Sequence, residues 1–172
     1  MKIKEKIDMI IHIWSDMAGN DKTGAEIVAE LAGRDLNRDG RVVNLVICGN
    51  SKFYDYSWLE NQLDLWVKQH AYPDMIILGG ASGVDFLAER WADNNNIRLA
   101  VYNEAWSSPR PNSVTDSGRP EAIASLAKEM LNHATHMLAF PGPESVWTKK
   151  MMEIGVQMNV PVACVELPTT GL

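Results

Sequence analysis

The sequence predicts an α/β fold in which a doubly wound, five-stranded parallel sheet follows an N-terminal helical arm. Three observations predict it. Five short apolar runs recur along the chain, helical patterns separate them, and each run is apolar at successive positions rather than at alternate ones. Continuous apolar runs are typical of strands that are covered on both faces. Strands that alternate with helices form right-handed βαβ units, so we expect the strands to pair in parallel.

The expected strands lie at residues 41–48, 75–78, 98–102, 136–140 and 161–165. The first, "RVVNLVIC", is rich in β-branched residues and stops at Gly49. Helical patterns occupy the connections, at residues 58–66, 86–91, 123–131 and 151–156. We therefore assign residues 41–172 to one α/β domain.

The expected arm, residues 1–40, contains two helical stretches. The second has apolar residues on one face and can begin with a capping box formed by Thr23 and Glu26. The first carries a longer apolar stripe, made of Ile3, Ile7, Ile10, Ile11 and Trp14. Such a stripe is unfavourable in water, and the domain already has helices for both faces of its sheet. We therefore expect a homodimer or a higher homo-oligomer.

Composition excludes several classes of function. The 172 residues carry a net charge of −6, which argues against broad binding to nucleic acid or to anionic membranes. No apolar run is long enough to span a bilayer, and the first residues are charged rather than leader-like. We expect a soluble, cytoplasmic protein. Cys48 and Cys164 both fall in expected strands and are interpreted as buried, reduced thiols.

Two motifs that suggest metal binding are set aside. "DLNRDG" at 35–40 matches the first half of an EF-hand loop, but its twelfth position is Val46, inside a strand. We interpret it as a turn leading into that strand. The histidines are scattered along the chain, and only His133 and His136 are close in sequence; the others are His12 and His70. The sequence therefore predicts no metal site and no cofactor.

Small residues gather where the expected strands end. Gly49, Asn50, Ser51 and Lys52 follow the first strand; Gly79, Gly80, Ala81, Ser82, Gly83 and then Asp85 follow the second; Pro141 and Gly142 follow the fourth. In parallel α/β sheets ligands bind beyond the carboxyl ends of the strands. Free amides and hydroxyls suit phosphate or ribose oxygens, so these residues predict a ligand crevice. The alternative is that the glycines only turn the chain and that Ser82 and Asp85 form a capping box.

A long connection, residues 107–120, adds candidates beside the crevice. It is rich in proline and serine, which is compatible with a lid or with an ordinary surface loop. As a lid, it would bring Trp106 to stack on a base and Arg119 to offset the charge of a phosphate.

Four stretches of the sequence resemble a known family. They are "CGNSKFYDYSWLENQLD", "ILGGASGVDFLAERWA", "EAW" and "AFPG" followed by Thr148. They are similar to the SLOG superfamily, the relatives of DprA and LOG, and most of all to its stand-alone YspA-like branch. The resemblance covers residues 42–167. It implies a Rossmann-like fold that binds a nucleotide or a nucleotide-derived ligand. Within the superfamily some members cleave nucleoside monophosphates at the N-glycosidic bond, and others bind ligands without chemistry.

The resemblance also shows departures that bear on catalysis. The hydrolase pattern is PGGxGTxxE, whereas this chain has Pro143 at the second glycine and, when Thr148 is aligned with the threonine, Met151 at the glutamate. Methionine cannot act in acid–base catalysis. We therefore expect ligand binding without catalysis. The alternative is an N-glycosidic hydrolase that uses Asp85 and Glu89, which are one helical turn apart; that pair is equally compatible with a cap and an ion pair.

Overall fold

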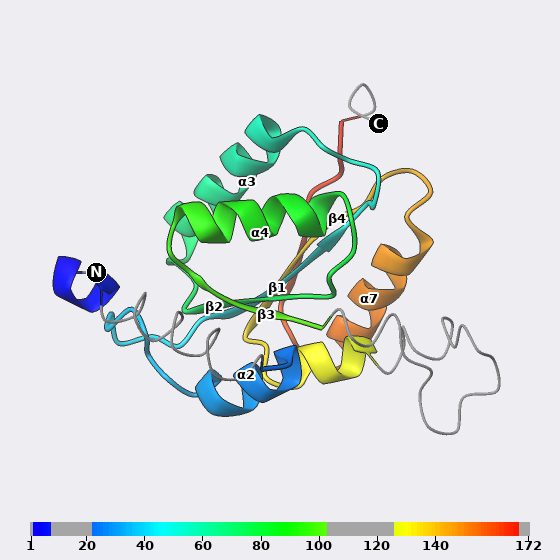
Figure 1. The fold of residues 1–172 in the computed structure, drawn as a ribbon. Helices are drawn as coiled ribbons and strands as arrows, with labels where there is room; N and C mark the ends of the chain where they lie inside the picture. The colour runs from blue at the N-terminus through cyan, green and yellow to red at the C-terminus, as the bar shows by residue number, and fades with distance from the viewer. Residues whose placement is uncertain (1, 8–21, 103–125, 169–172) are drawn as a thin grey trace.

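The computed structural model describes residues 2–7, 22–102 and 126–168, and its centre is a five-stranded sheet. The strands are β1 (Asn44–Gly49), β2 (Met75–Leu78), β3 (Arg98–Val101), β4 (His136–Phe140) and β5 (Val162–Cys164). They lie in the order β3-β2-β1-β4-β5, and every neighbouring pair is parallel (Figure 1). The predicted fold class is confirmed.

Helices cover both faces of the sheet (Figure 1). One face carries α3 (Tyr56–Gln69) and α4 (Val84–Asn94). The other carries α2 (Gly24–Leu31), the helix at 126–131 and α7 (Val146–Gln157). This division follows from the right-handed crossover rule, because the chain steps from β1 to β3 in one direction and from β4 to β5 in the other. None of the described helices has the length and hydropathy to cross a membrane.

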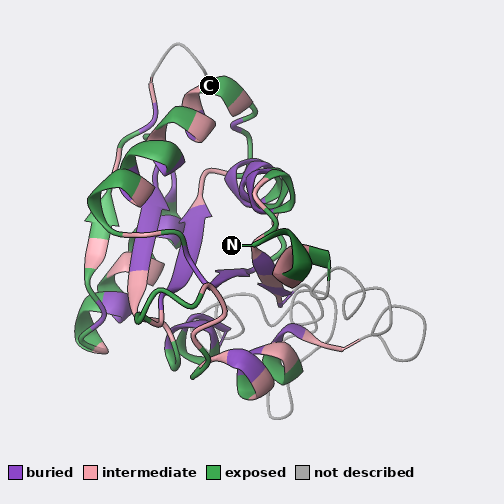
Figure 2. Ribbon diagram, turned by 90° about the vertical axis from the view of Figure 1, so that its left-hand side faces the viewer, coloured by how far each residue is buried: buried purple, intermediate pink, exposed green. Residues whose placement is uncertain are grey.

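The core consists of two apolar layers separated by the sheet. Leu45 and Ile47 of β1 pack into the layer under α3 and α4, while Val46 and Cys48 pack into the opposite layer. The central strands are buried along their length (Figure 2). Successive residues of β1 therefore enter different cores, which explains why its sequence is apolar without alternation.

The two helices expected in the arm differ in how far their apolar residues are buried. In α2 the N-cap role of Thr23 is confirmed, because the Glu26 N–H donates to Thr23 Oγ1 at 3.2 Å. The Glu26 side chain accepts from the Thr23 hydroxyl at 3.1 Å. The same helix buries Val28 and Leu31 in the core, so it is part of the layer over the sheet.

The short helix at 3–7 leaves its apolar residues in solvent. Ile3 is 78% exposed and Ile7 is 50% exposed, whereas an ion pair of 3.0 Å joins Glu5 to Arg38. The rest of the apolar stripe, Ile10, Ile11 and Trp14, lies outside the described residues.

One prediction about the cysteines is wrong. Both are free thiols, and Cys48 is buried, but Cys164 is exposed. Its strand, β5, has only three residues and pairs with β4 alone, so one side of it meets no other strand. The apolar run that predicted a buried strand instead forms a short edge strand.

The "DLNRDG" segment is a turn before β1, and its carboxylates bind backbone amides. Asp35 accepts hydrogen bonds from the N–H groups of Asp39 and Gly40, and the buried Asp74 accepts from Asn37 and Val43. Oxygens of Asp35, Asp39 and Asp74 lie within 4.8 Å of one another. Their hydrogen bonds show that Asp35 and Asp74 shape the entry into β1.

Gly83, the N-cap of α4, gives a prediction about stability. Its φ is +69°, and a Cβ would lie 2.3 Å from the Asn50 carbonyl oxygen. Gly40 has a φ of +83° with open space around it, and Gly33 has open space and no such φ. Urea unfolding should therefore show little change for Gly33→Ala, a loss of about 1 kcal/mol for Gly40→Ala, and more than about 3 kcal/mol for Gly83→Ala. Equal losses at Gly40 and Gly83 would contradict the steric argument.

Candidate functional site

The loops that follow β1 and β4 meet at the point where the strand order reverses. The Asn50 N–H donates to the Phe140 carbonyl at 3.1 Å, and Asn50 Nδ2 donates to Ser145 Oγ at 3.2 Å. Ser145 Oγ also accepts from the Gly142 N–H at 2.8 Å. The predicted residues Asn50 and Gly142 are thus joined through Ser145, which the sequence reasoning did not select. The only sequence signal for it is a polar residue between a proline-rich turn and a helix.

The loop that follows β2 lies against the loop that follows β1. The Val84 N–H donates to the Asn50 carbonyl at 3.1 Å, and the Ser82 hydroxyl donates to the Ser51 carbonyl at 2.8 Å. We call these three loops, residues 49–52, 79–83 and 141–145, together with the helix starts that follow them, the carboxyl-edge site. Gly80 and Ser82 are exposed there, while Gly79 and Gly83 are buried.

The predicted capping box at Ser82 and Asp85 is wrong. The N-cap of α4 is Gly83, and no side chain caps the helix. The Ser82 hydroxyl is used by Ser51, and Asp85 Oδ2 accepts from the Ala81 N–H at 3.1 Å. Both side chains therefore make hydrogen bonds with backbone groups of the loops, and neither caps the helix as their spacing suggested.

Asp85 is an unusual carboxyl group. Its side chain is 6% exposed. Burial raises its pKa from the usual 3.8 to about 7. Hydrogen bonds from the Ala81 and Gly79 N–H groups act in the opposite direction and lower the pKa, while the charge of Glu89 raises it further. Asp85 also lies close enough to Cys48 to help burial raise the pKa of that thiol. Near neutral pH Asp85 can therefore both release and accept a proton.

The helices of the carboxyl-edge site begin without side-chain caps. Thr23 caps α2 and Asp55 caps α3, whereas α4 and α7 have no side-chain cap hydrogen bond. Two N–H groups at the start of each uncapped helix, those of Asp85 and Phe86 in α4 and of Trp147 and Thr148 in α7, make no hydrogen bond among the described residues. Free N–H groups and the positive end of the helix dipole attract anions.

Other predicted residues have varied surroundings. The Lys52 side chain is exposed, and its N–H donates to Asn50 Oδ1 at 2.7 Å, so both polar atoms of the Asn50 side chain have partners. Thr148 is 6% exposed, and its hydroxyl has no hydrogen bond to any described residue. Glu89 is exposed. Trp106 and Arg119 lie outside the described residues, so their proposed contacts stay predictions.

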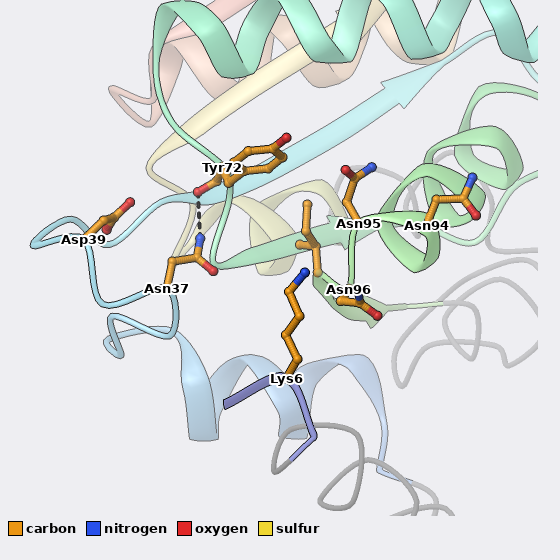
Figure 3. A pocket seen from close by; sticks show the side chains of 8 residues that line it. Lys6, Asn37, Asp39, Tyr72, Asn94, Asn95 and Asn96 are labelled. Atoms are coloured by element: carbon orange, nitrogen blue, oxygen red, sulfur yellow. Dashed lines mark hydrogen bonds between the residues drawn. The ribbon is translucent and has the colours of Figure 1, made fainter. Parts of the chain in front are cut away.

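A cavity of about 390 Å³ lies at the opposite, amino edge of the sheet. Its lining includes Lys6, Asn37, Tyr72 and three successive asparagines, Asn94, Asn95 and Asn96 (Figure 3). Several of these amides are engaged within the protein: Asn37 Nδ2 donates to the Tyr72 and Pro73 carbonyls, and Asn95 Nδ2 donates to the Trp91 carbonyl. Asn37 therefore joins the turn before β1 to the segment before β2, and Asn95 closes the end of its own helix, α4.

The raised pKa of Asp85 predicts a pH-dependent effect of Asp85→Asn on stability. The folded chain holds the Asp85 proton more tightly than the unfolded chain does, so the free energy of unfolding of the wild type falls as the pH rises from about 4 to about 7. The variant has no carboxyl group at this position, so its free energy of unfolding should not show this fall. Chemical unfolding should show that the variant gains on the wild type by up to about 3 kcal/mol from pH 4.5 to pH 8. The control Glu153→Gln, which removes an exposed carboxyl group of α7, should show little such gain. A pH-independent difference for Asp85→Asn would refute the assignment.

The comparison with protein families agrees with this geometry. The family model YAcAr, described as the YspA, cpYpsA-related SLOG family, matches residues 43–108, which include β1, β2, β3 and the first two loops of the carboxyl-edge site. No curated protein and no solved structure shows significant similarity to the chain. The resemblance expected from the sequence is confirmed over residues 43–108, which are similar to the YspA, cpYpsA-related SLOG family.

Proposed function

We propose that the protein binds a nucleotide or a nucleotide-derived ligand at the carboxyl-edge site, without catalysis. The observation that carries this proposal is the pair of uncapped helix starts, which leaves N–H groups of α4 and α7 free. Leaving such groups without partners is unfavourable unless water or a ligand satisfies them. Membership of the SLOG family suggests a nucleotide-related ligand.

A phosphate group matches the chemistry of these helix starts. It accepts several hydrogen bonds and its charge is stabilised by the dipoles of α4 and α7. Gly80 is exposed with a φ of +80°, so no side chain blocks the approach to the loop backbone. The unpartnered hydroxyl of Thr148, in the first turn of α7, offers a further hydrogen bond.

Two observations bear on catalysis. Met151, which stands at the position of the hydrolase glutamate, is a partly buried residue of α7 that packs against the core. It offers no acid or base, which favours binding alone. The alternative, an N-glycosidic hydrolase of nucleoside monophosphates, is favoured by Asp85, because a carboxyl group with a pKa of about 7 suits a general acid. Release of free base from the nucleotide separates these two functions.

Binding can be tested with AMP and with inorganic phosphate as probes. AMP should raise the melting temperature of the wild type, and phosphate should do so more weakly, because each binds the folded chain alone. Gly80→Val should abolish the AMP shift, since a branched side chain would occupy the space of the phosphate.

The matched control is Gly40→Val, which introduces the same side chain at another exposed glycine with positive φ, at the amino edge. It should lose stability but keep the AMP shift. Chromatography of the same samples should find no adenine. Equal AMP shifts for the wild type and Gly80→Val would contradict the proposed site, and adenine release would favour the hydrolase.

We further propose that the chain forms a homodimer or a higher homo-oligomer through the apolar stripe of its first helix. Ile3 and Ile7 are exposed, and such residues are unfavourable in water unless another surface covers them. Because α2 contributes Val28 and Leu31 to the core, substitution is a cleaner test than truncation.

The double variant Ile3→Asp, Ile7→Asp should be monomeric in light scattering at micromolar concentration, whereas the wild type should not. The control Leu65→Asp changes an exposed apolar residue of α3 and should leave the assembly intact. A monomeric wild type would refute the proposal.

A further inference from the structure

Two histidines that are far apart in the sequence lie together at the amino edge of the sheet. His70 is the C-cap of α3, and His136 is the first residue of β4. Their ring centroids are 5.4 Å apart, with an angle of 76° between the planes. The indole ring of Trp66 stacks on His70 at 4.2 Å and meets His136 edge-on at 5.5 Å. The sequence reasoning considered His133 with His136 and so missed this pair.

The hydrogen bonds are compatible with the same tautomer in both rings. His70 Nδ1 lies 3.1 Å from the Trp66 carbonyl oxygen, which can only accept, so Nδ1 carries the hydrogen. His136 Nδ1 lies 2.8 Å from Thr135 Oγ1. We assign the hydrogen of the Thr135 hydroxyl to the Asn44 carbonyl, 3.2 Å away, so that Thr135 Oγ1 accepts from His136 Nδ1.

Each ring therefore keeps a lone pair on Nε2. Neither Nε2 has a hydrogen-bond partner among the described residues. His70 is exposed and His136 is partly exposed, so solutes can reach the pair. A neutral imidazole that donates Nδ1–H to an oxygen and presents Nε2 is the usual form of a metal-binding histidine.

The separation of the rings also suits one metal ion. Two imidazole nitrogens at about 2.0–2.1 Å from a tetrahedral ion place the ring centres about 5 Å apart. The observed 5.4 Å is close to that separation. Ca²⁺ and Mg²⁺ prefer oxygen ligands, so imidazoles select a divalent transition-metal ion.

We propose that His70 and His136 form a two-imidazole site for a divalent transition-metal ion such as Zn²⁺, whose remaining positions are taken by water. The ion would join the end of α3 to the start of β4. It would lie about 13 Å along β4 from the carboxyl-edge site, given the rise of a strand. The site is therefore independent of the proposed nucleotide function, and its expected effect is on stability.

Zn²⁺ itself is the probe in the first test, which uses calorimetric titration of the full chain carrying Cys164→Ser to remove the exposed thiol. One equivalent of Zn²⁺ should bind with a dissociation constant in the micromolar range and should raise the melting temperature. His70→Gln and His136→Gln should each weaken Zn²⁺ binding at least tenfold. His133→Gln removes an exposed histidine three residues from His136 and should leave binding unchanged.

A second test examines which ring nitrogens of the two histidines bind the ion. In long-range ¹H–¹⁵N spectra, Zn²⁺ should shift the Nε2 resonances of His70 and His136 while their Nδ1 atoms stay protonated. The same spectra without Zn²⁺ report whether each variant is folded. The proposal is overturned if the wild type does not bind Zn²⁺ at 100 micromolar, or if either His70→Gln or His136→Gln binds as tightly as the His133→Gln control. The histidines would then be only a packing cluster with Trp66.

Discussion

The pairing of β1 with β4 is the constraint on which the rest of the structure depends. Five residue pairs align the strands, from Leu45 with His136 to Gly49 with Phe140. The chain leaves β1 toward α3 on one face and leaves β4 toward α7 on the other, so the two loops diverge where the strands end. Gly49 sits at this junction: a Cβ there would lie 2.8 Å from the Phe140 carbonyl oxygen and 2.7 Å from Val84 Cγ2. Three elements can meet at the carboxyl edge because Gly49 has no side chain.

The features of the carboxyl-edge site reduce the stability of the unliganded protein. Ionisation of Asp85 is unfavourable because its carboxyl group is buried, and its pKa is therefore raised to about 7. The N–H groups of Phe86 in α4 and Thr148 in α7 likewise lack the hydrogen bond that the corresponding N–H groups of α2 and α3 donate to Thr23 and Asp55. Unfavourable groups of this kind concentrate at functional sites, where a bound ligand offsets their cost. Their convergence on one edge is why we assign binding to that edge.

The sequence was sufficient to predict the sheet, its parallel pairing and the edge where small residues gather, because short apolar runs such as "MIIL" that end in turn residues and alternate with helical patterns are typical of strands buried on both faces. It was not sufficient to tell an edge strand from a central one. The run that contains Cys164 resembles the others, and its exposure follows from its place beside β4 alone. Strand order is a property of the whole fold and leaves little trace in a five-residue run.

Contacts between distant segments limited the remaining predictions. Ser82 and Asp85 have the spacing of a capping box. In the fold, however, the Ser82 hydroxyl donates to the Ser51 carbonyl and Asp85 accepts from the Ala81 N–H, so neither caps the helix. Ser145 and the His70–His136 pair depend on which loops the fold brings together, so no local pattern reveals them. The raised pKa of Asp85 depends on burial beneath the glycine loop, which spacing alone cannot predict.

The most direct test of the central claim is a ¹H–¹⁵N titration of the backbone amides with AMP. The free N–H groups of Asp85 and Phe86 in α4, and of Trp147 and Thr148 in α7, should shift downfield as they donate to the phosphate. The amides of Gly40 and Asn96, at the amino edge, should not move. Shifts confined to the amino edge, or no shift of the α4 and α7 amides at AMP concentrations that saturate binding, would contradict the account.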